Sequence, residues 1–167
     1  MGRRLWAKSQ RGLIVALVAG MVGFLAGGGT PGLGQAGAAD SPPAPEFHNT
    51  DPNTTYPWSD VVRVGPMLYL AGVLGLGDDG KLVPGGITPE SERTMENLKN
   101  ILESNGSSVD RVVSCLLFLA DIRDREAFNV AYQKYFAQGH FPARTAIGTS
   151  GLYAGARVEI SCQAVSR

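Results

Sequence analysis

The sequence predicts a single α+β domain in which one mixed β-sheet packs against two helices. Two segments, residues 88–106 and 124–138, carry apolar side chains at helical spacing. Short apolar runs typical of strands occur before, between and after these segments, in the order ββα-βα-ββ. The 167 residues suffice for one domain of ordinary size. A two-layer arrangement around one core follows from this order.

The first 39 residues are expected to be a signal peptide. Residues 1–11 hold four Lys or Arg and no acid, and the apolar run Leu13–Ala26 that follows has 14 residues. A membrane span needs about 20. Small residues then allow cleavage after Ala38 or Ala39.

This segment predicts an exported bacterial protein, periplasmic or secreted, that is not attached to the membrane after cleavage. The stretch "RRLWAK" is similar to a twin-arginine signal, although paired arginines also occur in Sec signals. A retained membrane anchor is the alternative.

The charge of the mature chain argues against nucleic acid as the main partner. The whole chain has 15 basic and 15 acidic residues; without residues 1–39, 11 and 15 remain, a net charge of −4. The glycine spacing fits neither phosphate-binding motif. His48 and His140 have no ligands at metal-binding spacing, so we expect no metal site.

The domain itself is expected to span residues 56–167. Residues 40–55, rich in Pro, Asn, Asp and Thr, are predicted to form a linker or an extended arm. The stretches "SDVVRVG" and "MLYLAGV" then predict a hairpin around a Gly-Pro turn. In the first helix Thr88 is the predicted cap, Pro89 fills the first position and Gly106 ends it.

The second half contains the most apolar strand. "VDRVVSCLLFLA" is a near-continuous apolar run that predicts burial on both faces. The second helix is expected to be capped by Asp124, with an aromatic stripe of Phe128, Tyr132, Tyr135 and Phe136. Cys115 and Cys162 lie in strand-like runs; we expect two buried thiols, although an oxidising compartment permits a disulfide.

Two charges stand inside the last two predicted strands, where they are costly without partners. If these strands form a direct hairpin, Glu159 lies opposite Ala146 and Arg144 is one diagonal step away, about 7–8 Å. Spacing alone leaves an internal ion pair and a functional pair equally open. A guanidinium suits bidentate binding of a carboxylate, and a partly buried carboxylate can handle protons or orient water.

The stretch "FPARTAIG", followed 15 residues after its Arg by the Glu of "RVEIS", resembles the C-terminal signature of the RidA family. These proteins are reactive-intermediate or imine deaminases, in older terms translation-inhibitor endoribonucleases. "VRVGPMLYLAG", "PGGITPESERTMENLKNILESNG" and "AFNVAYQKYF" match the family pattern in order. The resemblance covers about residues 57–166.

The resemblance implies a chorismate-mutase-like fold and a homotrimer with active sites between subunits. It also implies hydrolysis of 2-imino or enamine acids, such as 2-aminoacrylate and 2-iminobutyrate, to 2-keto acids and ammonia without a cofactor. Carried over, Arg144 would bind the substrate carboxylate and Glu159 would position or activate water. Asn129, Gly72 and Trp58 would complete the substrate site, Gly72 through backbone N–H groups.

Three positions depart from the family pattern. Trp58 stands where active members often carry Tyr, Ala71 where Ser or Thr is common, and Ala146 where Cys is frequent. The lost hydroxyls remove donors to substrate or water. The resemblance thus favours an exported imine deaminase; the alternatives are a non-catalytic protein that binds small carboxylates in the same cleft, and an endoribonuclease.

Overall fold

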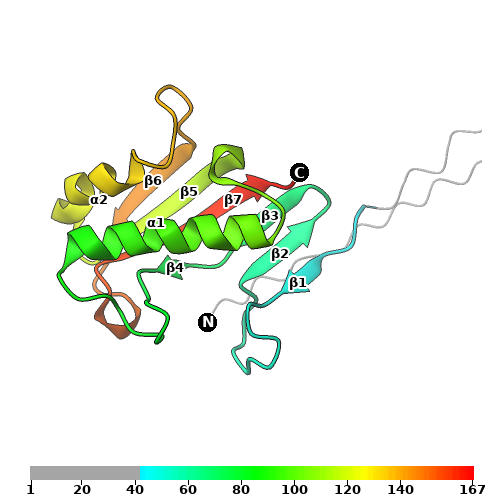
Figure 1. Cartoon of the computed structure of the whole chain (residues 1–167), viewed down its shortest axis with the longest axis horizontal. Coiled ribbons are helices and arrows are strands. Elements are labelled where there is room, and N and C mark those ends of the chain that lie inside the picture. The colour runs from blue at the N-terminus through cyan, green and yellow to red at the C-terminus, as the bar shows by residue number, and fades with distance from the viewer. Residues whose placement is uncertain (1–41) are drawn as a thin grey trace, which may run out of the picture. The chain divides into compact units, whose positions relative to one another are not determined.

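The computed structural model describes residues 42–167 (Figure 1). The predicted signal peptide lies outside these residues. One seven-stranded sheet has the order β1-β2-β3-β7-β5-β6, and β4 pairs with β7. The strands are β1 (Glu46–His48), β2 (Val61–Val64), β3 (Met67–Leu70), β4 (Val73–Leu74), β5 (Val112–Leu119), β6 (Ala143–Gly148) and β7 (Val158–Val165); the helices are α1 (Ile87–Ser104) and α2 (Arg125–Tyr132).

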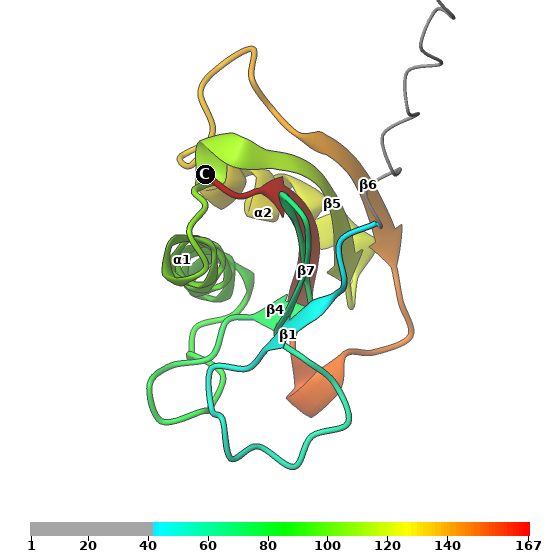
Figure 2. The same ribbon diagram turned by 90° about the vertical axis from the view of Figure 1, so that its right-hand side faces the viewer.

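Both helices lie on the same face of the sheet, which curves around α1 (Figure 2). The core fills the space between the two layers. Met95, Leu98 and Leu102 of α1 are fully buried there, as are Leu117 and Ile160 of the sheet. The predicted mixed sheet packed against two helices is confirmed. Within residues 42–167, neither helix is both long and apolar enough to cross a membrane.

The N-terminal part of the sheet begins earlier than the two predicted strands. The hairpin of β2 and β3 forms as predicted, and Gly65 in its turn has a φ of 56°, which glycine tolerates best. Part of the arm adds a further strand, because Phe47 of β1 pairs with Val62 of β2. Residues 46–48 therefore belong to the sheet.

Of the two predicted N-caps, Thr88 is wrong, whereas Asp124 has the predicted position but makes no side-chain capping bond. Gly86, with a φ of 84°, is the residue before α1, so Thr88 lies inside the first turn and does not cap it. Gly106 follows the end of α1 as expected. Asp124 does precede α2, but its carboxylate accepts hydrogen bonds from Arg157 and not from the helix. The helix ends at Tyr132, six residues before the predicted end at Gln138.

The last two strands do not form the direct hairpin that was considered for Arg144 and Glu159. Strand β5 lies between them, parallel to β6 and antiparallel to β7. Arg144 pairs with Cys115 of β5, and Glu159 pairs with Phe118 of the same strand. The physical reason is that β5 offers two pairing edges, and the crossover through α2 returns β6 parallel to it.

The two cysteines are directly opposite each other on β5 and β7 and form a disulfide. The expectation of two thiols is therefore wrong: register places the side chains within bonding reach. The expectation that β5 is buried on both faces is also wrong for the single chain. Val113 and Leu116 are 47% and 46% exposed, so only the face toward the helices is covered.

Candidate functional site

Strand β6 presents Arg144 to the aromatic side of α2. The guanidinium carbon lies 4.4 Å from the centre of the Tyr132 ring and 5.7 Å from that of Phe128. Its Nη2 donates a 2.6 Å hydrogen bond to Oδ1 of Asn129. The structure thus brings together two of the candidate site residues, Arg144 and Asn129. Stacking on the ring faces also favours the cation.

The charge of Arg144 has no acidic partner among residues 42–167. None of the ion pairs that these residues form includes Arg144. Its Nη1 is buried and makes no hydrogen bond to a described residue. Burial lowers the pKa of Arg144, yet a guanidinium remains charged at neutral pH. Glu126 acts on Arg144 electrostatically without forming an ion pair with it. A partly buried cation that makes no ion pair with the described residues favours an anionic ligand.

A cavity of about 360 Å³ adjoins this arginine. Its wall combines the guanidinium and two amides with an apolar rim. The lining residues are Asn129, Tyr132, Gln133, Phe141, Pro142 and Arg144. The arrangement suits a small molecule that carries a carboxylate and a short apolar group.

Glu159 lies beside an irregularity between β3 and β4. From the pair Tyr69–Gln163 to the pair Val73–Ile160, three residues on one side face two on the other, which is a β-bulge. Gly72 stands in this bulge, and a Cβ there would lie only 1.7 Å from Oε1 of Glu159. Gly72 therefore leaves the room that this carboxylate occupies. Burial raises the pKa of Glu159, and no charged neighbour contributes.

Arg144 and Glu159 face opposite sides of the sheet. Arg144 pairs with Cys115, and Cys115 pairs with Cys162, so these three side chains share the helix face. Glu159 is three positions before Cys162 and therefore points to the other face. The predicted residues thus form two separate groups in one chain: Arg144 with Asn129, and Glu159 with Gly72.

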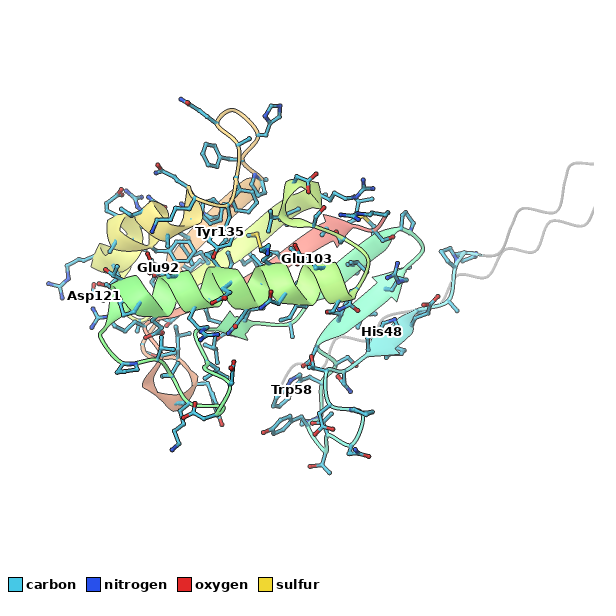
Figure 3. All side chains as sticks on the ribbon, viewed as in Figure 1. His48, Trp58, Glu92, Glu103, Asp121 and Tyr135 are labelled. Atoms are coloured by element: carbon cyan, nitrogen blue, oxygen red, sulfur yellow. A yellow bond between two sulfur atoms is a disulfide. The ribbon has the colours of Figure 1, made fainter. Side chains whose placement is uncertain are left out.

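Trp58 belongs to a loop next to the second group. Its ring stacks on that of Tyr56, with centroids 4.5 Å apart, and both side chains are exposed (Trp58 is labelled in Figure 3). The N–H of Ala71 donates to the carbonyl oxygen of Asp60, which ties this loop to the strand end before Gly72. Trp58 lines a separate cavity of about 210 Å³ and not that of Arg144.

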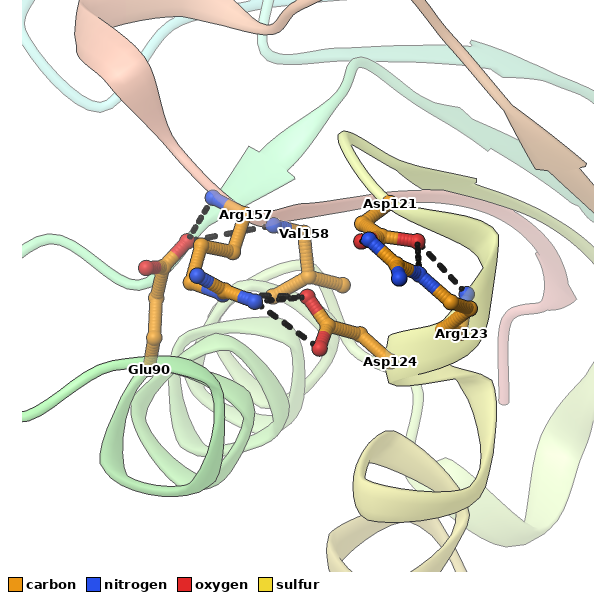
Figure 4. A network of polar contacts seen from close by, with 6 residues as sticks. All are labelled: Glu90, Asp121, Arg123, Asp124, Arg157 and Val158. Carbon is orange, nitrogen blue, oxygen red and sulfur yellow. Dashed lines mark hydrogen bonds and ion pairs between the residues drawn. The ribbon is translucent and has the colours of Figure 1, made fainter.

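A buried carboxylate holds the start of β7. Oε1 of Glu90 accepts hydrogen bonds from the N–H groups of Arg157 and Val158, at 2.7 and 3.1 Å (Figure 4). The Arg157 side chain in turn donates to both carboxylate oxygens of Asp124. These bonds join α1, α2 and β7 immediately before Glu159. Glu90 lies in the first turn of α1, and no local sequence pattern pointed to its contact with β7.

The fold and the two polar groups define a class: a small α+β domain with a partly buried arginine beside a cavity on one sheet face and a partly buried carboxylate on the other. The chain belongs to the endoribonuclease L-PSP family, whose profile matches residues 48–166.

Several characterised proteins and solved structures are similar to this chain, in agreement with the family. The yeast protein HMF1 is 36% identical over 74% of this chain and 95% of its own length. The 2-iminobutanoate/2-iminopropanoate deaminase of goat is 41% identical over 65% of this chain and 80% of its own. Among solved structures, RidA from the Antarctic bacterium Psychrobacter has a TM-score of 0.63 at 30% identity, covering 68% of this chain and 92% of that one.

Proposed function

We propose that the chain is a hydrolytic deaminase that converts small 2-imino or enamine acids to 2-keto acids and ammonia. The observation that carries this proposal is Arg144, a partly buried cation that forms no ion pair with residues 42–167 and lines a cavity of about 360 Å³. The names of relatives support the substrate class, since mammalian deaminases of 2-iminobutanoate and 2-iminopropanoate are 35–41% identical to the chain.

The chemistry needs few groups. Arg144 binds the substrate carboxylate, and Glu159 takes a proton from the water that attacks the imine carbon. A carbon–oxygen bond forms, the protons pass to nitrogen, and the carbon–nitrogen bond breaks to release ammonia. The raised pKa of Glu159 makes its carboxylate a stronger base. Because imines also hydrolyse unaided, orientation supplies much of the acceleration.

The two groups can act together only if copies of the chain associate, because they face opposite sides of one sheet. We propose a homotrimer in which Arg144 of one copy meets Glu159 of the next in the cleft between them. The open sheet face supports this, since it carries large exposed apolar side chains at Tyr69, Leu116 and Ile147. Sedimentation velocity tests the assembly, and a monomer at micromolar concentration would contradict it.

The direct test of the activity is release of ammonia and 2-ketobutanoate from 2-iminobutanoate, generated in situ from 2-aminobutanoate by an amino-acid oxidase. We expect wild type to exceed the spontaneous rate and Arg144→Ala to match it. Arg123→Ala is the control, because Arg123 is exposed and, among residues 42–167, forms an ion pair with Asp121 alone. Equal rates for wild type and Arg144→Ala would refute the proposal. Binding of 2-ketobutanoate without turnover would instead favour a non-catalytic carboxylate-binding protein.

We also propose that the protein is exported. The basic and apolar N-terminal sequence supports this, as does the disulfide of Cys115 with Cys162, a bond typical of oxidising compartments. The test is N-terminal sequencing of protein from the cell-envelope fraction. A start near Asp40 is expected, and an intact Met1 would contradict cleavage.

A further inference from the structure

The hydroxyl of Tyr132 is a buried polar group that the proposed reaction does not use. Tyr132 is 4% exposed, and its hydroxyl makes no hydrogen bond to any of residues 42–167. The ring packs beside Phe128 and Phe136, with centroids 5.6 and 4.6 Å away. Buried hydroxyls are nearly always hydrogen-bonded, so one without a partner indicates a strained or ligand-binding position.

A second unpartnered atom belongs to the side chain that stacks on this ring. Nη1 of Arg144 is also buried without a partner, while Nη2 is taken up by Asn129. The guanidinium carbon lies 4.4 Å from the Tyr132 ring centre, and both side chains line the same cavity. Two hydrogen-bond donors, from residues that line the same cavity, therefore have no acceptor among residues 42–167.

We propose that the Tyr132 hydroxyl binds the ligand carboxylate together with Nη1 of Arg144, which makes Tyr132 a second binding residue of the site. The inference rests on the proposed function only in taking the ligand to be a small 2-imino or 2-keto acid. A carboxylate has two oxygens and can accept from both donors at once. Burial raises the pKa of Tyr132, so its hydroxyl keeps its proton and remains a donor at neutral pH.

Entry of the ligand requires the cavity wall to adjust, since both donor atoms are shielded in the free chain. The wall includes Phe141, which is 47% exposed, and the exposed side chain of Gln133. Exposed side chains change rotamer within nanoseconds. Once the ligand is bound, the same shielding strengthens its hydrogen bonds.

The test is Tyr132→Phe, which removes one oxygen and keeps the ring that packs against Arg144. Tyr135→Phe is the matched control: it makes the same change three residues away, in a side chain that lines a different cavity. Calorimetry gives the Kd for 2-ketobutanoate, thermal melts give Tm with and without it, and kinetics give KM and kcat for 2-iminobutanoate.

We expect Tyr132→Phe to raise Kd and KM about 10-fold or more, the effect of losing a hydrogen bond to a charged group. The Tm of the free protein should stay the same or rise, since the hydroxyl makes no hydrogen bond to residues 42–167 that could be lost. The ligand-induced rise in Tm should shrink. Tyr135→Phe should leave Kd and KM unchanged.

The results separate this inference from the proposed function. An unchanged Kd in Tyr132→Phe overturns the inference even if wild type is an active deaminase. A lower Tm of the free variant with unchanged Kd shows a packing role, which also overturns it. If wild type binds 2-ketobutanoate but shows no turnover, and Tyr132→Phe weakens that binding, the inference is supported and the proposed function is refuted. A wild type that binds no 2-ketobutanoate contradicts both.

Discussion

Replacing Gly72 by alanine tests whether Glu159 must keep its place beside the β3–β4 bulge. A Cβ there would lie 1.7 Å from Oε1 of Glu159, whereas ordinary contact begins at 3.4 Å, so the oxygen must retreat by the difference, 1.7 Å. Misplacing a catalytic group by about 1 Å costs on the order of 100-fold in rate. We expect kcat/KM for 2-iminobutanoate to fall by about that factor.

The fold itself should tolerate this change. The φ of Gly72 is not positive, and the carboxylate that must move is only partly buried. We therefore expect the free energy of unfolding to fall by no more than about 1–2 kcal/mol. Gly151→Ala is the matched control, because no atom lies within 4 Å of a Cβ at that position.

Steady-state kinetics and thermal melts of both variants check these values. A folded Gly72→Ala protein with wild-type kcat/KM would show that the position of Glu159 does not matter to the reaction. Combining Gly72→Ala with Glu159→Gln sharpens the test. If Gly72 acts through Glu159, the double variant should be no slower than Glu159→Gln alone.

Three further predictions concern stability. Glu159→Gln should stabilise the protein at pH 7. Burial raises the pKa of Glu159 in the folded protein above the ordinary 4.5. Wild type therefore loses stability as the pH rises from 4.5 through that raised pKa, whereas the variant, which has no ionisable group there, should not. Thermal melts from pH 4 to 8 test this, and a difference in Tm between wild type and variant that does not change with pH would contradict it. Reducing the disulfide, which joins residues 47 apart, should lower the free energy of unfolding by about 2–4 kcal/mol, and urea titration with and without reductant measures it. Glu90→Leu should lower the free energy of unfolding by more than about 2 kcal/mol, because two backbone N–H groups lose their acceptor. Glu90→Gln keeps an acceptor oxygen and should lower it by less than about 1 kcal/mol. Urea titration of both variants measures the two losses, and equal losses would contradict this.

Elements with strong local patterns could be predicted from the sequence. The β2–β3 hairpin followed from two short apolar runs around Gly65 and Pro66, and α1 from apolar spacing that ends at Gly106. These elements form between residues that are close in sequence, so a short stretch of sequence is enough to predict them. The prediction of Thr88 as the cap is wrong, because Gly86 is the residue before the helix. Its positive φ of 84° could not be predicted from the residue type alone.

The pairing of strands that are far apart in the sequence could not be predicted from local patterns. The last two strands are neighbours in sequence, which suggested a hairpin between Arg144 and Glu159. In the structure β5 pairs with both strands, and its register also brings Cys115 opposite Cys162. Register across a sheet depends on which edges remain available, and this is a property of the whole fold.

The sequence named candidate site residues but did not predict how the fold arranges them. Family resemblance supplied Arg144, Asn129, Gly72 and Glu159, and the structure brings them together as two pairs. The aromatic stripe of α2 was interpreted as packing, so the hydroxyl of Tyr132 received no role. An amphipathic pattern records which side of a helix is apolar, and it says nothing about whether one polar atom on that side has a partner.

The opposite orientations of Arg144 and Glu159 have a genetic consequence. In the trimer that we propose, each chain gives its arginine to one neighbour and its glutamate to the other. Chains that lack the arginine and chains that lack the glutamate would each be inactive alone. Mixed in one ring, they would rebuild an intact site wherever an unaltered arginine meets an unaltered glutamate. Conversely, a chain that lacks both would damage two of the three sites in any ring that it joins, so a single defective allele would reduce activity by more than its share of the protein.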